Sequence, residues 1–476
     1  MDVLMACAEL APYVKRGSFS ALTAGDAVAA LGKTLSRLGH RVTVVLPHYP
    51  ELASHSGIML ARRLTRLKFD VGDETIEAAI LHARLGSDVD LVAIDLPGVL
   101  DEEGIVGTKK DAERFGFFAR AVCKLVDKHA DEGTPYDVVH AHDWPTALIP
   151  FLLKKGGRGP RCVLTVHDAA EQGRFPKDAV DRIGLSWDDF HPDGLEFYGD
   201  LNMLKAGVIS ADVVTTVSPT YAKELARTGT GDGLEGVFEA REGGVVGVLH
   251  GIDYARWSPA TDPHLRSRYD SEDASNKGRC KAALVKELDL PLEPDRPLLA
   301  FFGPIDERHG ADLVLGALEG IAKTGARLVI AGAGDDALVG AIEDAVASME
   351  NDVVFVGEAS EPMTHRIVSA ADAVLVPSRK EPCGLFQQIA QRYGAPPIAR
   401  ATGGLVDTVV DCDSRCETGT GFLFDEPTAE ALLAAVQRAV ATMKTPHWGT
   451  LRRRVMRLDL SWERPARRYA RLYKSS

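Results

Sequence analysis

The sequence predicts an α/β protein with two doubly wound sheets of parallel strands. Short, continuous apolar runs alternate with helix-like stretches through most of the 476 residues. Such runs are typical of strands that helices cover on both faces. The alternation stops in a polar, irregular stretch over residues 258–297 and then restarts. Because a chain of this length usually forms about two to three domains, each half is expected to fold around its own sheet.

The first half of the chain begins with a strand over residues 3–8, a helix over residues 27–38 that ends at Gly39, and a strand over residues 41–46. A glycine directly after the last helical turn is a common C-terminal signal. Further strands are expected over residues 137–141, 162–166 and 213–217.

The second half repeats the pattern. Strands are expected over residues 298–302, 327–331, 353–356, 373–377 and 397–399, and a helix over residues 384–393. The domain change is placed near residues 245–260, where a strand-like segment over residues 247–249 meets His250. In doubly wound sheets the ligand binds at the carboxyl ends of the strands, so the functional motifs are expected there.

Two histidines, an aspartate and a tryptophan close the strand predicted over residues 137–141. His140 and His142 are expected on one face of it, because side chains in a strand alternate with a period of two. They lack the further ligands that a metal site needs. Asp143 and Trp144 suit a sugar instead, since a carboxylate accepts hydroxyl groups and an indole stacks on a pyranose. The alternative is a tryptophan buried in the domain core.

Two other strand ends carry polar residues. His167 follows the strand over residues 162–166. A single histidine at a strand end is more often structural, and Asp168 beside it is a candidate to orient its ring. Lys15 and Gly17 follow the first strand, where a cation beside a glycine turn suits an anionic ligand; a solvated loop is the alternative.

A glycine turn over residues 381–385 leads into the helix predicted over residues 384–393. Backbone N–H groups at a helix N-terminus can face a phosphate, and the Glu381 carboxylate can accept sugar hydroxyls. The alternative is that Glu381 only favours the helix dipole. A second glycine turn, at Gly403 and Gly404, offers further amides. The sequence contains no GxGxxG and no GxxxxGK[ST], so dinucleotide and P-loop sites lack their signatures.

Taken together, these motifs resemble those of the bacterial glycogen synthase and plant starch synthase family, which are retaining glucosyltransferases of the GT-B fold. The resemblance runs from Met1 to about Tyr473. It rests on matched segments at residues 8–12, 139–144, 192–199, 204–207, 216–222, 251–253, 377–379, 381–385, 392–394 and 400–405. It implies two Rossmann-like domains that face each other across a cleft. These would be an acceptor-side domain over residues 1–250, a nucleotide-sugar domain over residues 251–460, and a helix over residues 461–476 that crosses back.

The resemblance implies a role for each matched residue. The expected catalytic residues are Glu381, His167 and Asp143. The expected donor-binding residues are Lys15, Gly17, Asp26, His309, Gly384 and Leu385. The expected sugar- or acceptor-binding residues are Glu9, Trp144 and His250. No metal and no other cofactor is implied, because protein cations hold the diphosphate in this family.

Several positions that would face the phosphates depart from the family pattern. Residues 15–19 read KRGSF instead of KTGGL. Pro304 and His309 stand where the family has arginine and lysine, and Phe386 stands where a threonine hydroxyl reaches the phosphates. Asp168 and His250 replace asparagines. The residues that could compensate for the lost cations are Arg16, Arg308 and Arg379.

The expected reaction is the transfer of glucose from ADP-glucose to the non-reducing end of an α-1,4-glucan, with retention. The departures leave two alternatives open: a paralogue that binds glucan with little or no turnover, or a transferase with another nucleotide-sugar donor. The formal charge of −13 argues against nucleic acid as a partner. No apolar run has membrane-spanning length and no leader is expected. The seven scattered cysteines fit reduced thiols in the cytoplasm.

Overall fold

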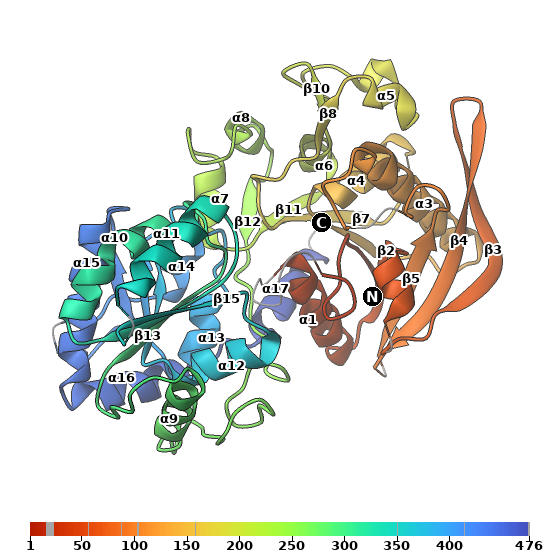
Figure 1. The fold of residues 1–476 in the computed structure, drawn as a ribbon. Coiled ribbons are helices and arrows are strands. Elements are labelled where there is room, and N and C mark those ends of the chain that lie inside the picture. The colour runs from red at the N-terminus through yellow and green to blue at the C-terminus, as the bar shows by residue number, and fades with distance from the viewer. Residues whose placement is uncertain are drawn as a thin grey trace. The chain divides into compact units, whose positions relative to one another are not determined.

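Each half of the chain forms its own sheet and its own core. The computed structural model describes residues 1–15, 23–55, 57–86, 88–101, 104–157, 159–349, 351–413 and 415–474. The chain divides between His250 and Gly251 into two compact units (Figure 1). Of the described residues, the first unit contains those up to His250 and those from Trp462 onward, and the second unit contains Gly251–Ser461.

The first unit contains a nine-stranded sheet in the order β12-β11-β7-β6-β1-β2-β5-β4-β3. Its strands are β1 (Asp2–Ala6), β2 (Arg41–Pro47), β3 (Ala61–Val71), β4 (Glu74–Leu85), β5 (Val89–Asp95), β6 (Val138–His142), β7 (Arg161–Val166), β11 (Val213–Thr216) and β12 (Val245–Gly247). The strands from β12 to β5 pair in parallel. The five strands predicted for this half are confirmed to within two residues at each end.

The hairpin of β3 and β4 at one edge of this sheet is antiparallel, which corrects the expectation of parallel strands throughout (Figure 1). Most of β3 is exposed, with Leu67 and Phe69 as its buried residues. A search for continuous apolar runs misses such a strand, because only one of its faces is covered.

The first unit also contains helices of different lengths and a small second sheet. The helices are α1 (Ala24–Arg37), α2 (Pro50–Ser54), α3 (Asp111–Asp131), α4 (Leu148–Lys155), α5 (Ala179–Arg182), α6 (Met203–Ser210), α7 (Pro219–Leu225), α8 (Glu235–Glu239), α17 (Glu463–Leu472) and the 3₁₀ turns η1 (Trp144–Thr146) and η2 (Trp187–Asp189). The small sheet has the order β8-β10-β9, with β8 (Arg174–Pro176), β9 (Glu196–Phe197) and β10 (Asp200–Asn202).

The C-terminal helix α17 belongs to the first unit. Trp462, Tyr469 and Tyr473 join the core that α1 forms against β1 and β2. The Tyr473 hydroxyl lies 2.8 Å from Nδ1 of His140, and the Tyr469 hydroxyl lies 3.3 Å from Oγ1 of Thr165. The end of the chain therefore completes the environment of β6 and β7.

The second unit contains six parallel strands in the order β15-β14-β13-β16-β17-β18. They are β13 (Leu298–Phe302), β14 (Arg327–Ala331), β15 (Val353–Gly357), β16 (Ala373–Val376), β17 (Pro397–Arg400) and β18 (Phe422–Phe424). The helices are α9 (Lys277–Glu287), α10 (Ala311–Lys323), α11 (Asp336–Ala347), α12 (Glu361–Ala370), α13 (Phe386–Arg392), α14 (Gly403–Thr408), α15 (Ala429–Met443) and α16 (His447–Met456). The five strands predicted for this half are confirmed to within one residue.

Helix α9 lies within the stretch over residues 258–297 that the sequence predicted to be irregular, so that prediction is wrong there. The helix has a weak apolar stripe, with Cys280, Leu284 and Val285 among its buried residues. One of its buried side chains is a lysine, Lys277. Such a pattern lacks the periodicity by which an amphipathic helix is usually found.

The buried Lys277 ties three helices together. Its ammonium donates to the backbone carbonyls of Ser369 and Tyr393, both at 2.9 Å. These carbonyls belong to the C-terminal ends of α12 and α13, where free carbonyls and the helix dipole favour a cation. Burial, with a smaller effect of Arg452, lowers the pKa of Lys277 to about 7.

Replacing this amine should destabilise the second unit. We expect Lys277→Met to lower the free energy of unfolding by about 2–4 kcal/mol, because buried carbonyls lose a charged donor. Denaturant unfolding of both proteins measures the difference. Between about pH 7 and pH 10.5 the unfolded lysine binds more protons than the folded one, so the wild type should gain stability over the variant as the pH rises. A difference that stays constant over this range would contradict the lowered pKa.

Candidate functional site

Both sheets reverse their strand order once, and the predicted site residues follow the strands at these points. In the first sheet β1 lies beside β6, and the chain winds away from this pair in opposite directions. In the second sheet the corresponding pair is β13 and β16. At such a switch point the loops diverge and leave room for a ligand.

The loop after β1 holds a paired cation. Lys15 Nζ lies 3.3 Å from Oδ2 of Asp26, and both side chains are largely buried. Asp26 sits in the first turn of α1 and accepts a hydrogen bond of 3.0 Å from the Thr23 backbone N–H, as part of a capping box. The start of α1 thus holds Lys15 in place. Gly17, predicted beside it, lies outside the described residues.

Glu9 is buried next to this helix start, with 3% of its surface exposed. The backbone of Gly25 packs directly against it, and a Cβ at Gly25 would lie 3.1 Å from Cγ of Glu9. Burial and the negative charge of Glu9 raise the pKa of the Cys7 thiol. Glu9 is therefore a desolvated carboxylate at the end of β1.

Asp143 joins the ends of β6 and β7. Its Oδ1 accepts a hydrogen bond of 2.7 Å from the His167 backbone N–H, and its own N–H donates to the Thr165 carbonyl at 2.9 Å. The backbone of Asp143 has φ 59°, a conformation that costs about 1–3 kcal/mol in a residue other than glycine. These two hydrogen bonds hold the strained residue and position His167. Asp168 turns to its own loop, where it accepts from the Ala170 N–H.

Four imidazoles from distant parts of the chain form a cluster. His140 and His142 share one face of β6, as predicted, with ring centroids 4.1 Å apart. His142 lies 5.3 Å from the ring of His167, which lies 5.1 Å from that of His250. His250 in turn lies 4.9 Å from Trp462.

Three of these histidines, His140, His142 and His250, are held in the neutral form. Burial lowers the pKa of His140 to about 3 and takes the pKa values of His142 and His250 well below the usual range, with smaller effects of the neighbouring imidazoles. Among the residues that the structure describes, no group of three or more His, Cys, Asp or Glu side chains is arranged to hold a metal ion. A neutral histidine cluster suits an uncharged ligand rich in hydroxyl groups.

The stacking role expected for Trp144 is corrected by its position. The indole is 6% exposed and packs edge-on against Phe115 and Phe175, at 4.9 and 5.7 Å between ring centroids. Gly173 covers it closely, since a Cβ there would lie 2.3 Å from the ring. An indole enclosed in this way has no free face for a pyranose, and the core alternative is the one observed.

Trp144→Ala should therefore act on stability. We expect a loss of about 3–5 kcal/mol in the free energy of unfolding, the usual cost of removing a buried aromatic ring. Trp187→Ala is the matched control: that indole is 47% exposed, so its removal should change stability by about 0.5 kcal/mol or less. Denaturant unfolding measures both variants. Unchanged stability of Trp144→Ala with lost glucan binding would restore the stacking role.

The two glycine turns of the second unit form a single structure. The Gly404 N–H donates to the Glu381 carbonyl at 2.9 Å, and a Cβ at Gly404 would lie 2.0 Å from the Cys383 carbonyl oxygen. Gly384 has φ +66°, and Leu385 follows as the N-cap of α13. Helix α13 thus starts at Phe386, two residues later than predicted. The Ser378 hydroxyl donates to Oε2 of Glu381 at 2.9 Å, which orients this carboxylate.

His309 supplies a cation near Glu381. Oδ1 of Asp306 lies 2.7 Å from Nδ1 of His309 and also accepts from its backbone N–H at 2.7 Å. Burial by itself lowers the pKa of His309, but the hydrogen bond to Asp306 and the negative charge of Glu381 outweigh it and raise that pKa above its usual value. His309 therefore carries more positive charge near neutrality than a free histidine.

The departure at Phe386 is committed to packing, and Arg379, one of the cations expected to compensate, is committed to an ion pair. The Phe386 ring packs edge-on against Phe302 at 4.8 Å. Arg379 forms a bidentate ion pair with Asp312, at 2.6 and 2.7 Å, and also donates to the Glu307 carbonyl at 2.6 Å. Arg379 is thus held by its own unit, and a phosphate would have to compete with a carboxylate for it.

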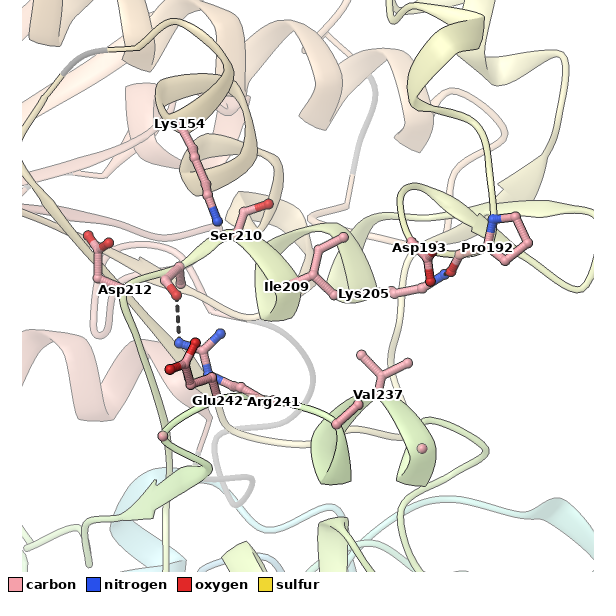
Figure 2. Close-up of a pocket in the computed structure, with 14 residues that line it drawn as sticks. Lys154, Pro192, Asp193, Lys205, Ile209, Ser210, Asp212, Val237, Arg241 and Glu242 are labelled. Atoms are coloured by element: carbon pink, nitrogen blue, oxygen red, sulfur yellow. Dashed lines mark hydrogen bonds between the residues drawn. The ribbon is translucent and has the colours of Figure 1, made fainter.

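A separate cavity of about 630 Å³ lies in the first unit beside α6 (Figure 2). Its lining carries both signs of charge, and none of the predicted site residues is part of it. Arg241 donates to the carbonyls of Val208 and Ala211 at the end of α6, and Lys205 donates to those of Pro192 and Glu196. These two cations support the backbone around α6.

The structure brings several predicted residues together within each unit. In the first unit Asp143 contacts His167, His167 contacts His250, and Lys15 contacts Asp26. In the second unit the negative charge of Glu381 helps to raise the pKa of His309. Sequence reasoning left His142 without a role, although it hydrogen-bonds to His167. The parallel pairing of β6 and β7 could have indicated this contact. It places His142 opposite Thr165, which is two residues before His167.

Comparisons with known proteins cover nearly the whole chain. Residues 2–240 match the starch synthase catalytic domain family, and residues 287–447 match the glycosyl transferases group 1 family. The chain is 38% identical to glycogen synthase of Anaeromyxobacter sp. (strain Fw109-5), over 100% of this chain and 99% of that protein. It is 39% identical to glycogen synthase of Aromatoleum aromaticum, over 99% and 96% of the two chains.

Solved structures give the same picture of the fold. The catalytic domain of starch synthase IV from Arabidopsis thaliana, bound to ADP and acarbose, matches with a TM-score of 0.89 and 30% identity over 99% of this chain and 98% of that one. Sucrose-phosphate synthase from Thermosynechococcus elongatus matches with a TM-score of 0.65 at 21% identity, over 100% and 98%, and supports the fold only. Within the described part of the chain, no helix is both long and apolar enough to cross a membrane.

Proposed function

The chain belongs to the family of bacterial glycogen synthases and plant starch synthases, and from this premise we propose that it transfers glucose from ADP-glucose to the non-reducing end of an α-1,4-glucan. The ADP and acarbose bound to the starch synthase IV structure support a nucleoside diphosphate leaving group and a glucan acceptor. Family membership makes the protein a GT-B glycosyltransferase. The donor, the acceptor and the roles of single residues are the proposed parts.

One observation carries the proposal. Glu381, held by Ser378, precedes the start of α13, and its negative charge helps to raise the pKa of His309. A carboxylate that accepts sugar hydroxyls, backbone N–H groups that face a phosphate, and a cation that balances a diphosphate are the three things that a nucleotide sugar requires. In this proposal they act together at the β13/β16 switch point.

The reaction follows from these groups. The bond between the anomeric carbon of glucose and the diphosphate oxygen breaks, and a bond to the acceptor hydroxyl oxygen forms on the same face. The proton of that hydroxyl passes to the leaving diphosphate. The negative charge of Glu381 favours the positive charge that develops at the anomeric carbon, while His309 and the amides of Gly384 and Leu385 balance the charge on the diphosphate.

The first unit supplies neutral and anionic partners for the sugar. Glu9 and Asp143 are acceptors for hydroxyl groups, and the imidazole of His167 and the neutral imidazole of His250 can donate or accept. Lys15, held by Asp26, is the cation that the first unit would offer to the diphosphate. Trp144 has no direct role in this proposal. Its buried indole packs in the core next to the end of β6.

A turnover assay tests the proposal. We expect purified protein to release ADP from ADP-glucose and to extend glycogen in step, more efficiently than with UDP-glucose. Glu381→Ala should lower kcat by at least about 100-fold, the usual cost of one preorganised electrostatic group, while the circular dichroism spectrum stays unchanged.

The matched control for this variant is Glu426→Ala, which removes an exposed carboxylate from the same unit and should leave turnover unchanged. A folded wild type that binds glycogen but releases no ADP or UDP would refute the proposal. Full activity of Glu381→Ala would refute the role given to this carboxylate.

The charge on His309 predicts a pH dependence. As the pH rises through the raised pKa of His309, the imidazolium is lost and kcat/KM for ADP-glucose should fall. Asp306→Asn removes the acceptor that raises this pKa, so burial should then dominate and the falling limb should move to lower pH. Steady-state rates between about pH 6 and pH 9 measure both profiles. If the two limbs coincide, His309 is not the titrating group.

A further inference from the structure

The reaction as proposed gives no role to the buried histidine that contacts His167. His142 is the last residue of β6, is 3% exposed, and places its Nδ1 3.0 Å from Nε2 of His167. This is a hydrogen bond between two imidazoles, so a proton must sit on one of these two nitrogens. Which nitrogen carries it decides whether the rest of the His167 ring donates or accepts.

The ring of His142 is fixed from several directions. Its backbone N–H donates to Oγ1 of Thr146 at 2.7 Å, and the Thr146 hydroxyl donates back to the His142 carbonyl at 2.9 Å. The ring of His140 lies against it, and both nitrogens of His140 are occupied, by the Tyr473 hydroxyl at 2.8 Å and by Thr165 Oγ1 at 2.7 Å. The position of His142 is therefore set by Thr146 and His140 as well as by its bond to His167.

The surroundings of the second nitrogen settle the tautomer. Nε2 of His142 is fully buried and, among the described residues, has no hydrogen-bond partner. A proton on Nε2 would create a buried N–H without an acceptor, whereas a proton on Nδ1 leaves only an unmet lone pair. Buried N–H groups without a partner are the rarer of the two. The Nδ1–H of His142 thus donates to Nε2 of His167.

We propose that His142 is a positioning residue that holds the His167 imidazole as the tautomer with its proton on Nδ1, so that His167 presents an N–H donor to a hydroxyl of the transferred sugar. The sugar contact rests on the proposed function; the tautomer does not. Asp143 holds the backbone of His167 through Oδ1, so two consecutive residues of the β6 end determine both the backbone and the ring of His167.

The tautomer can be measured without any turnover. Full-length protein with ¹⁵N-labelled histidine rings is observed by NMR, and the two spin systems are assigned from the spectra of H142N and H167Q. We expect the protonated type of nitrogen at Nδ1 of His142 and the unprotonated type at Nε2 of His167. The opposite pattern, with the proton on Nε2 of His167, overturns the proposal. Because this result does not depend on activity, it separates the proposal from the proposed function.

Two variants of similar size test the consequence for catalysis. The amide nitrogen of asparagine reaches the place of the imidazole Nδ1, whereas that of glutamine reaches the place of Nε2. We expect H142N to keep kcat within about threefold of the wild type and H142Q to lose about tenfold, as for one hydrogen bond, with KM for glycogen unchanged in both. Equal losses in the two variants overturn the proposal.

A double-mutant comparison separates positioning from a general structural effect. If His142 acts through His167, then H142Q should cost nothing further in the H167A background. A tenfold loss in both backgrounds would show that His142 acts on stability or on another group, and would overturn the proposal. If H142Q fails to fold, the NMR measurement on the wild type still shows which of the two nitrogens carries the proton and so tests the proposal.

Discussion

The loops that follow parallel strands leave the sheet at the carboxyl ends of the strands. Two neighbouring loops diverge only where the strand order reverses. Each unit has such a point in the middle of its sheet, between β1 and β6 and between β13 and β16. The residues with chemical roles come from the segments that leave these strands, and hydrogen bonds between neighbouring strand ends hold them. Asp143 spans β6 and β7, and the Gly404 N–H joins the segments after β16 and β17. The reversal of strand order is thus the constraint on which the site depends.

Histidine serves opposite purposes in the two units, and the partners of each ring decide which. His140 and His142 are buried among hydroxyls and other imidazoles, so desolvation dominates and the rings stay neutral. His309 is only partly buried, and it has a carboxylate partner in Asp306 and a second carboxylate, Glu381, nearby. Neutral rings suit the hydroxyl groups of a sugar, and a charged ring suits a diphosphate. The immediate partners of these three imidazoles therefore decide which unit's histidines suit the sugar and which suit the diphosphate in the proposed reaction.

The departure at Phe386 and the candidate compensating cation Arg379 are both integrated into the second unit. Phe386 packs on Phe302 at the end of β13, and Arg379 is held by Asp312. An apolar contact stands where the family has a hydroxyl, and a carboxylate already pairs with the arginine. His309 is the substituted position whose surroundings increase its positive charge. In the proposed transfer, His309 and the amides of the glycine turn thus stabilise more of the charge on the diphosphate than they would in the family pattern.

The sequence by itself determined the buried parallel strands next to the two switch points, the two glycine turns and the common face of His140 and His142, because each is encoded by residues close together in the chain. It failed where the signal was not local: β3 has one covered face, and α9 lacks a strong apolar stripe and buries the charge of Lys277 among carbonyls of other helices. Only the tertiary structure decided that Trp144 is enclosed by Phe115 and Phe175, and that His142 meets His167. Burial and protonation depend on neighbours brought together by folding, and desolvation is a property of that environment rather than of the residue.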